Sequence, residues 1–274
     1  GLPTVERIKD YQPKLFQIRN ELAKIDVVFS INPWVTLGHR DFGRDCTGTF
    51  PDMTFMTGPD GTTCKACACP LCAGWRSYIT ELWQVYAEPE PAVIWVEDDI
   101  RTFNHRPVRF GCFCDAHLSR FSEKAGRRVA REELAAAILA PGAPHPYRKI
   151  WLDLQAEIMV ETAAVLERAV HSVSPRTRLG LMSSDPPRHA AEGRDWPAFT
   201  KALAGPLELV SRPSMAIYRE TSLRGLYESA HNLRLTRSCL PVDTIVETEV
   251  ENIPFTRYSK SNQFTFLQMA LSFA

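Results

Sequence analysis

Three consecutive acidic residues follow a short apolar run in the first half of the chain. The run Ala-Val-Ile-Trp-Val fills residues 92 to 96, and Glu97, Asp98 and Asp99 come directly after it. A short run of apolar and β-branched residues is typical of a buried strand. Crowded carboxyl groups raise one another's pKa, which keeps one of them protonated as a general acid. The segment therefore predicts a strand that delivers carboxylates to an active site.

A second acidic group lies near the end of the chain. Glu247, Glu249 and Glu251 occupy alternate positions, so their side chains point to one side if the strand continues through them. Glycoside hydrolysis needs two carboxyl groups that face each other across the scissile bond. One protonates the leaving oxygen, and the other attacks carbon or activates water. The two acidic groups together favour a glycosidase.

Short apolar runs alternate with longer helical patterns along the whole chain. The predicted strands cover residues 27–32, 53–56, 92–97, 178–182, 207–211 and 244–249. The predicted helices cover residues 5–24, 73–87, 115–125, 147–173, 195–203, 219–234 and 257–274. This order is typical of a parallel sheet covered by helices, in a doubly wound fold or a (β/α)8 barrel.

The polar residues that follow almost every predicted strand favour the barrel. Catalytic groups of (β/α)8 enzymes gather at the carboxyl ends of many strands. We therefore predict one α/β domain over residues 1–274, a catalytic (β/α)8 TIM barrel. Because a barrel has eight strands, the six predicted ones suggest a chain truncated at both ends, with strands two to seven visible.

Several other side chains at the predicted strand ends are candidates for substrate binding. Trp34 offers a ring on which a sugar could stack, and Gly38 would let the backbone expose His39. Each candidate also has a purely structural alternative, as a core aromatic residue or an ordinary ion-pair partner. The predicted binding residues are Trp34, His39, Arg101, Asn104, His105, Arg212, Tyr218 and Glu247.

The cysteines are unevenly distributed and predict a structural zinc site. Cys112, Cys114 and His117 open a predicted helix, and Cys64, Cys67, Cys69 and Cys72 crowd into nine residues earlier in the chain. Thiolates and an imidazole are zinc ligands, and four such ligands close a tetrahedral structural site. We expect a fourth ligand from the earlier group, and no cofactor for catalysis itself.

The overall composition indicates an uncharged ligand. Lysine plus arginine equals aspartate plus glutamate at 32 each, so no net field draws the chain to nucleic acid or an anionic membrane. No run of 18 apolar residues is present, and the N-terminal residues lack the pattern of a signal peptide. We expect a cytoplasmic protein with a carbohydrate substrate and no membrane partner. A homo-oligomer is compatible with these features.

Residues 92–121 and 243–261 carry a resemblance to a known family. A strand that ends in acids, a loop with His, and the pattern Cys-x-Cys-x-x-His-Leu-x-x-Phe resemble the fourth strand and following loop of glycoside hydrolase family 42 β-galactosidases. The resemblance implies a retaining (β/α)8 enzyme with its acid/base after strand four and its nucleophile after strand seven. Some members of the family hold a structural zinc with cysteines of this loop. The resemblance therefore also implies a structural zinc in this chain.

The resemblance assigns roles residue by residue. The family's Asn-Glu pair falls on Asp98-Asp99. Asp99 would therefore be the acid/base, and Asp98 would stand where the family has the side-chain amide of the asparagine. The nucleophile falls on Glu249 or Glu251, and we expect Glu249 because it lies nearer the strand. The implied zinc ligands are Cys112, Cys114 and His117, with Cys69 or Cys72 as the fourth.

Two other functions fit the same residues. A metal-dependent hydrolase or lyase would use Asp98, Asp99 and His105 to hold a divalent cation. A non-catalytic relative would keep the barrel and bind carbohydrate while its acids are displaced. Glycoside hydrolysis remains the first prediction because it accounts for both acidic groups.

Overall fold

A parallel sheet of four strands lies at the centre of the molecule. The computed structural model describes residues 1–274 except 216–217, 222–223, 252–255, 257 and 274. The strands run in the order β3-β6-β7-β8. They are Val93–Val96, Arg178–Ser183, Val210–Pro213 and Ile245–Val246. The predicted α/β class with a parallel sheet is therefore confirmed.

The sheet remains open in the described part of the chain. A single parallel bridge joins Ile31 to Ile94 at the outer edge of β3, and another joins Ser214 to Glu249 beyond β7 and β8. β3 and β8 lie at opposite ends of the strand order, and no described strand pairs the two edges. Closure into a barrel thus stays a prediction.

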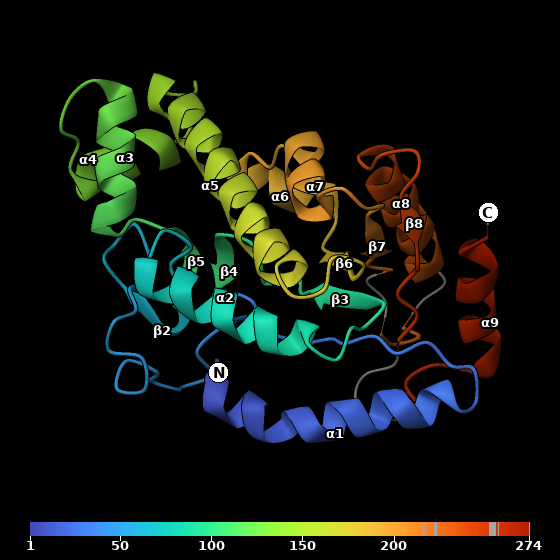
Figure 1. Ribbon diagram of the computed structural model, residues 1–274. Coiled ribbons are helices and arrows are strands. Elements are labelled where there is room, and N and C mark those ends of the chain that lie inside the picture. Colours follow the sequence, from blue (N-terminus) through green and yellow to red (C-terminus); the bar gives the residue numbers. More distant parts are fainter. Residues whose placement is uncertain (216–217, 222–223, 252–255, 257, 274) are drawn as a thin grey trace.

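Helices cover the sheet and follow the predicted order closely (Figure 1). α5 begins behind His145, which accepts a hydrogen bond from the Tyr147 amide at 3.1 Å, and Pro146 fills its first turn. Its apolar stripe packs against both α2 and α7. The long helices are α1 Val5–Ala23, α2 Ala73–Ala87, α3 Asp115–Ala125, α5 Pro146–His171, α7 Trp196–Ala204, α8 Arg224–Ser238 and α9 Asn262–Leu271.

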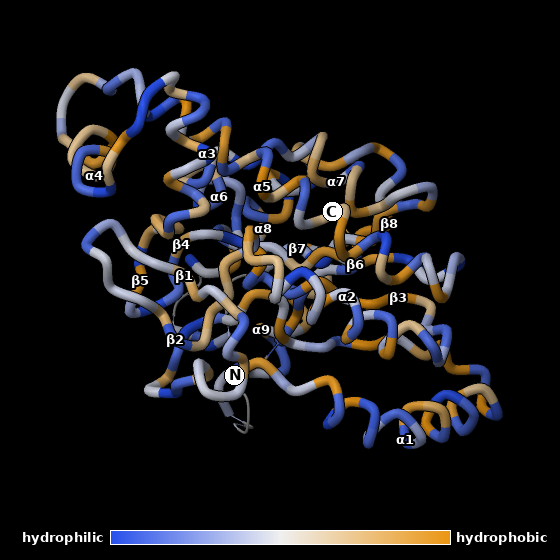
Figure 2. The backbone as a smooth tube through the Cα atoms, turned by 60° about the vertical axis from the view of Figure 1, so that its left-hand side comes forward, coloured by the Kyte–Doolittle hydropathy of each residue, from blue (hydrophilic) through white to orange (hydrophobic). Residues whose placement is uncertain are grey.

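α1 is the outermost long helix and packs against α2 (Figure 1). Figure 2 shows hydrophilic and hydrophobic residues alternating along it. Only Val5 in this helix is fully buried, so α1 covers α2 with a narrow apolar stripe. No helix in the described part of the chain is both long enough and apolar enough to cross a membrane.

Two of the predicted strands differ from the structure. Residues 27–32 form no regular strand, but Phe29 and Ile31 exchange three backbone hydrogen bonds of 2.8–2.9 Å with residues 92–95 at the edge of β3. The prediction that residues 53–56 form a strand of the parallel sheet is wrong, because β1 (Phe55–Thr57) pairs antiparallel with β2 (Thr63–Ala68) in a separate hairpin. Hydrophobic period reports burial, and all three residues of β1 are buried, but it does not report the pairing partner.

The segment after β3 also contains structure that the sequence did not predict. β4 (Phe103–His105) and β5 (Val108–Phe110) form a two-stranded antiparallel sheet. Two helices, α4 (Arg131–Leu139) and α6 (Pro186–His189), and the 3-10 turn Ala190–Glu192 are also additional. These short elements lack the length that makes a hydrophobic period readable.

A close contact between neighbouring strands explains one glycine. Gly180 of β6 lies opposite Trp95 of β3, and a Cβ at position 180 would stand 2.4 Å from the Trp95 ring. Only glycine therefore lets the tryptophan lie across β6. This packing fixes the register that brings the carboxyl ends of β3 and β6 together.

Candidate active site

A pocket of about 340 Å³ opens at the carboxyl ends of the parallel strands. Its walls come from the loop after Ile31, the ends of β3, β6 and β7, and the segment after β8. This is the edge of a parallel sheet at which α/β enzymes place their ligands. The carboxylate pocket, as we call it, is lined by Asn32, Trp34, His39, Glu97, Asp98, Met182, Ser183, Arg212, Ser214, Tyr218, Glu249 and Glu251.

Glu97 and His39 form one wall of the carboxylate pocket. His39 Nε2 lies 3.5 Å from Glu97 Oε1, and the Glu97 side chain is largely buried. Burial alone would lower the pKa of His39, but Glu97 and the charge of Asp99 outweigh it and raise the pKa. The pair can therefore hold a proton next to the pocket.

Asp98 also lines the carboxylate pocket but is tightly held. The Ser184 amide donates to its Oδ1 at 2.8 Å, and the Ser184 hydroxyl donates to its Oδ2 at 2.5 Å. Arg101 Nη1 lies 2.6 Å from Oδ2. Burial opposes ionisation of Asp98, yet Arg101, His189 and Ser184 together lower its pKa. Asp98 is thus an ionised acceptor and a poor proton donor.

Asp99 lies outside the pocket, in contrast to its predicted place at the mouth. Its side chain is completely buried, and its Oδ2 accepts hydrogen bonds from the amides of Thr36 at 2.7 Å and Gly38 at 2.6 Å. Gly38 has φ +105°, and a Cβ there would stand 2.4 Å from the Ala66 carbonyl oxygen. Asp99 thus fixes the loop that carries His39. Burial raises its pKa to about 6.

Glu249, beyond β8, also lines the carboxylate pocket. The Tyr218 hydroxyl donates to Glu249 Oε1 at 2.5 Å, and Arg212 Nη2 lies 3.7 Å from Oε2. Arg212 also reaches Glu251, with Nη1 3.3 Å from Oε1. Burial raises the pKa of Glu249 above its ordinary value, and Tyr218 and Arg212 offset only part of this rise. Glu97 and Glu249 therefore line one pocket, and the negative charge of Glu97 contributes to the raised pKa of Glu249.

The remaining predicted binding residues divide into two groups. Trp34, His39, Arg212 and Tyr218 line the pocket, and Trp34 is 68% exposed. The other predicted binding residues do not line it. Arg101 is held by Asp98, and His105 is fully buried with Nε2 2.7 Å from the Arg101 carbonyl oxygen. Asn104 and Glu247 are exposed elsewhere.

A buried charged cluster behind the pocket was not predicted. Glu192 is completely buried, accepts from the Thr102 amide at 2.8 Å, and lies 2.5 Å from Arg194 Nη2. Its other contact is His189, whose Nδ1 lies 3.0 Å from Glu192 Oε1. Arg194 lowers the pKa of Glu192 to about 2 despite burial. The His-x-x-Glu-x-Arg spacing is a signal that could have pointed to this cluster.

Four metal-binding side chains converge between the end of β2 and the start of α3. The Cys/His cluster consists of Cys69, Cys112, Cys114 and His117, whose ligand atoms all lie within 4.8 Å of one another. The Cys69 and Cys114 sulfurs are 3.6 Å apart, and His117 Nδ1 is 3.5 Å and 3.3 Å from them. Tetrahedral zinc with bonds of about 2.3 Å to sulfur sets two sulfurs roughly 3.8 Å apart. The donor set and spacing fit zinc.

The cluster separates the two candidates for the fourth ligand. Cys69 belongs to it, whereas Cys72 lies apart, with its sulfur 3.0 Å from the Thr54 amide nitrogen. Among the described residues, no other group of three or more metal-binding side chains converges. Asp98, Asp99 and His105 therefore do not converge on one cation site in the described part of the chain.

Comparison with known proteins rests on structure alone. No family model and no curated protein matches the chain. Two structures of a GH42 β-galactosidase from G. stearothermophilus, one of them a catalytic mutant, match with TM-scores of 0.62 and 0.60, both at 12% identity. They cover 95% and 96% of this chain, and the chain covers 41% of each.

Two further structures give the same result. A β-galactosidase from Rahnella sp. R3 matches with a TM-score of 0.60 at 13% identity over 93% of this chain and 40% of its own. The catalytic domain of a β-amylase from Paenibacillus polymyxa matches with a TM-score of 0.56 at 12% identity over 94% of this chain and 85% of its own. The chain spans about two fifths of the β-galactosidases. It shares, at a distance, the fold of the GH42-like glycosidases.

Proposed function

We propose that this chain is the catalytic region of a glycoside hydrolase that acts on an uncharged sugar. The observation that carries the proposal is the carboxylate pocket, which Glu97 and Glu249 both line, from the two ends of the strand order β3-β6-β7-β8. Two facing carboxyl groups are the requirement for cleaving a glycosidic bond. The structural neighbours, which include β-galactosidases and a β-amylase, support the same class of reaction.

Glu249 suits the role of nucleophile. A nucleophile must be ionised and oriented, and Tyr218 and Arg212 both favour the carboxylate form. Its oxygen would attack the anomeric carbon as the bond to the leaving oxygen breaks. A covalent glycosyl ester would result, as in retaining enzymes.

Glu97 suits the role of acid and base better than Asp99. Of the three consecutive acids, Asp99 bonds to backbone amides outside the pocket and Asp98 is held ionised by Arg101. Glu97 lines the pocket, with its Oε1 3.5 Å from His39 Nε2. Glu97 would protonate the leaving oxygen. It would then take a proton from the water that attacks the anomeric carbon, as the bond from that carbon to Glu249 breaks.

A structural zinc is a separate part of the proposal. The Cys/His cluster is buried and lies outside the carboxylate pocket, so a bound ion there would hold the β1–β2 hairpin against α3 and take no part in the reaction. Four protein ligands would leave no open position for substrate.

A panel of 4-nitrophenyl glycosides tests the proposed function. Glu97→Gln should lower turnover by about 10²- to 10⁴-fold, the usual contribution of a general acid. The loss should shrink on 2,4-dinitrophenyl glycosides, whose leaving groups need no protonation. Glu249→Gln should be inactive on both. Glu208→Gln, at an exposed ion pair with Arg178, is the matched control and should behave as wild type.

Two results would contradict the proposal. Unchanged turnover in Glu97→Gln or Glu249→Gln would remove these residues from the reaction. A protein that binds sugars but hydrolyses none of the panel would instead be a non-catalytic carbohydrate-binding relative.

A further inference from the structure

A buried histidine lies directly behind the pocket-lining Asp98. His189 is 1% exposed, and its Nε2 lies 3.8 Å from Asp98 Oδ1 with no hydrogen-bond partner. The rings of Phe103 and Trp196 pack against it at steep angles of 74° and 90°, with both ring centroids 5.5 Å away. The ring is therefore held in place, and its free nitrogen faces a carboxylate of the carboxylate pocket.

Glu192 determines which nitrogen of His189 carries the proton. An ionised carboxylate only accepts hydrogen bonds, and Arg194 keeps Glu192 ionised, so His189 Nδ1 must be the donor at 3.0 Å. In the neutral ring, Nε2 then presents a lone pair toward Asp98 Oδ1. Two acceptors face each other, and one proton placed between them would complete a hydrogen bond.

We propose that His189 is a positioning residue for Asp98. His189 takes up one proton at Nε2, and the protonated ring draws Asp98 Oδ1 into a hydrogen bond. A normal N–H···O bond is about 2.9 Å long, so the carboxylate would have to move by roughly 1 Å away from the pocket. That movement weakens the bond from the Ser184 amide and any bond from a sugar hydroxyl. Sugar binding should therefore weaken when the pair becomes protonated.

The charged groups around His189 determine the pH range in which it takes up this proton. Asp98 comes from β3, and Glu192 and Arg194 come from the segment that follows α6. Arg101 lies beyond Asp98, and Arg188 on the same helix pairs outward with Asp185. Burial and Arg194 lower the pKa of His189 against the effect of both acids, so the ring is neutral at pH 7.

The tautomer is the first test and does not depend on enzyme activity. In protein labelled with ¹⁵N-histidine, long-range proton–nitrogen correlation at pH 7 should show a protonated Nδ1 and an unprotonated Nε2 for His189. Lowering the pH should convert Nε2 to the protonated form. A protonated Nε2 at pH 7, or a ring that never titrates, overturns the inference.

The second test measures binding, and it rests on the proposed carbohydrate site. The probe is 4-nitrophenyl 1-thio-β-D-galactoside, which is neutral and resists hydrolysis, titrated calorimetrically between pH 7 and pH 4. His189→Phe keeps the ring packing and removes both nitrogens. Wild-type affinity should fall about 3- to 10-fold at the acid end relative to His189→Phe, the value of one hydrogen bond. The two proteins should bind equally at pH 7.

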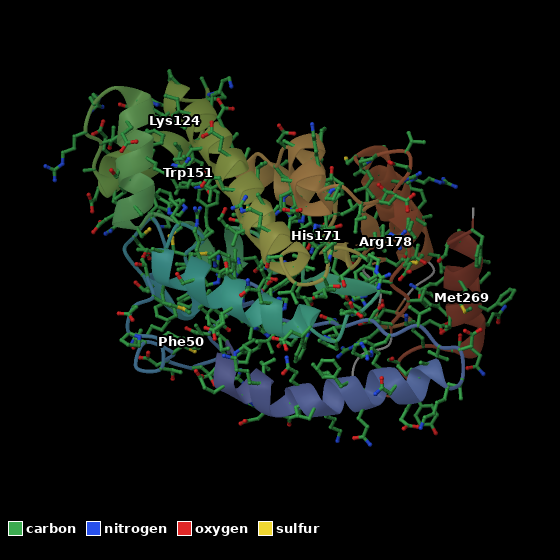
Figure 3. The ribbon with its side chains drawn as sticks, in the orientation of Figure 1. Phe50, Lys124, Trp151, His171, Arg178 and Met269 are labelled. Carbon is green, nitrogen blue, oxygen red and sulfur yellow. The ribbon has the colours of Figure 1, made fainter. Side chains whose placement is uncertain are left out.

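His171 provides the matched control. It also pairs with a glutamate, since Nδ1 lies 2.8 Å from Glu167 Oε1, but its Nε2 bonds to the Thr177 carbonyl oxygen at 2.9 Å. It lies in α5, whose C-terminal end it forms (Figure 3). His171→Phe should keep the wild-type pH dependence.

Two further outcomes keep the inference falsifiable. If His189→Phe does not fold, His189→Leu replaces it, because an aliphatic side chain neither titrates nor donates a hydrogen bond to Asp98 and should behave as His189→Phe does. A variant without His189 that keeps the wild-type loss of affinity overturns the inference. Failure of all proteins to bind the probe contradicts a galactoside site, while the tautomer result still decides the role of His189.

Discussion

The hydrogen bond from Tyr218 to Glu249 should set how acidic Glu249 is. The bond is 2.5 Å long, and the accepting carboxylate is only 9% exposed. A hydrogen bond to a charged group contributes about 1.5–3 kcal/mol, and one pKa unit corresponds to about 1.36 kcal/mol. Removing the hydroxyl in Tyr218→Phe should therefore raise the pKa of Glu249 by roughly one to two units.

The direction follows from the role of Glu249 as nucleophile. The carboxylate must be ionised, so the acidic limb of kcat/KM follows its pKa. In Tyr218→Phe this limb should move upward by about one to two pH units, with a loss of roughly 10- to 100-fold at a fixed acidic pH. The assay is kcat/KM against pH on a hydrolysed 4-nitrophenyl glycoside. Tyr227→Phe, at an exposed tyrosine of α8, is the control. Coincident acidic limbs in Tyr218→Phe and wild type would refute the reasoning.

Two predictions concern the surroundings of the pocket. Purified protein should contain one zinc per chain by elemental analysis. The zinc should be lost in Cys69→Ser and kept in Cys72→Ser. Wild-type protein without zinc would contradict the proposed site. Burial raises the pKa of Asp99 from 3.8 to about 6, so the folded state binds this proton more tightly than the unfolded state. The stability of wild type relative to Asp99→Asn should therefore be greatest below pH 4 and fall by about 3 kcal/mol as the pH rises through 6. Urea unfolding measures this difference, and parallel pH curves would contradict it.

Much of the fold could be predicted because the long elements have a clear period. The helix at residues 147–173 appears as α5, and the strands at 92–97, 178–182, 207–211 and 244–249 appear as the four sheet strands, with small shifts. The hairpins could not be predicted, since the register between β1 and β2 depends on contacts far apart in sequence.

The candidate site was also predictable only in part. Four residues predicted near the strand ends line one pocket, namely Asp98, Glu249, Arg212 and Tyr218, and their roles stay predictions. The order of roles within residues 97–99 could not be predicted, because side chains alternate only while the strand continues. β3 ends at Val96, and beyond it Asp99 turns to the Thr36 and Gly38 amides. Those donors lie more than sixty residues away in the chain.

The most direct test of the central claim is covalent labelling of the nucleophile. A 2-deoxy-2-fluoro glycoside of a sugar that the protein hydrolyses should form a stable ester, because the fluorine slows the second step more than the first. Mass spectrometry should show one adduct per chain, and peptide mapping should place it on Glu249. Hydrolysis of the parent glycoside without any adduct, or an adduct on another residue, would contradict the proposed mechanism.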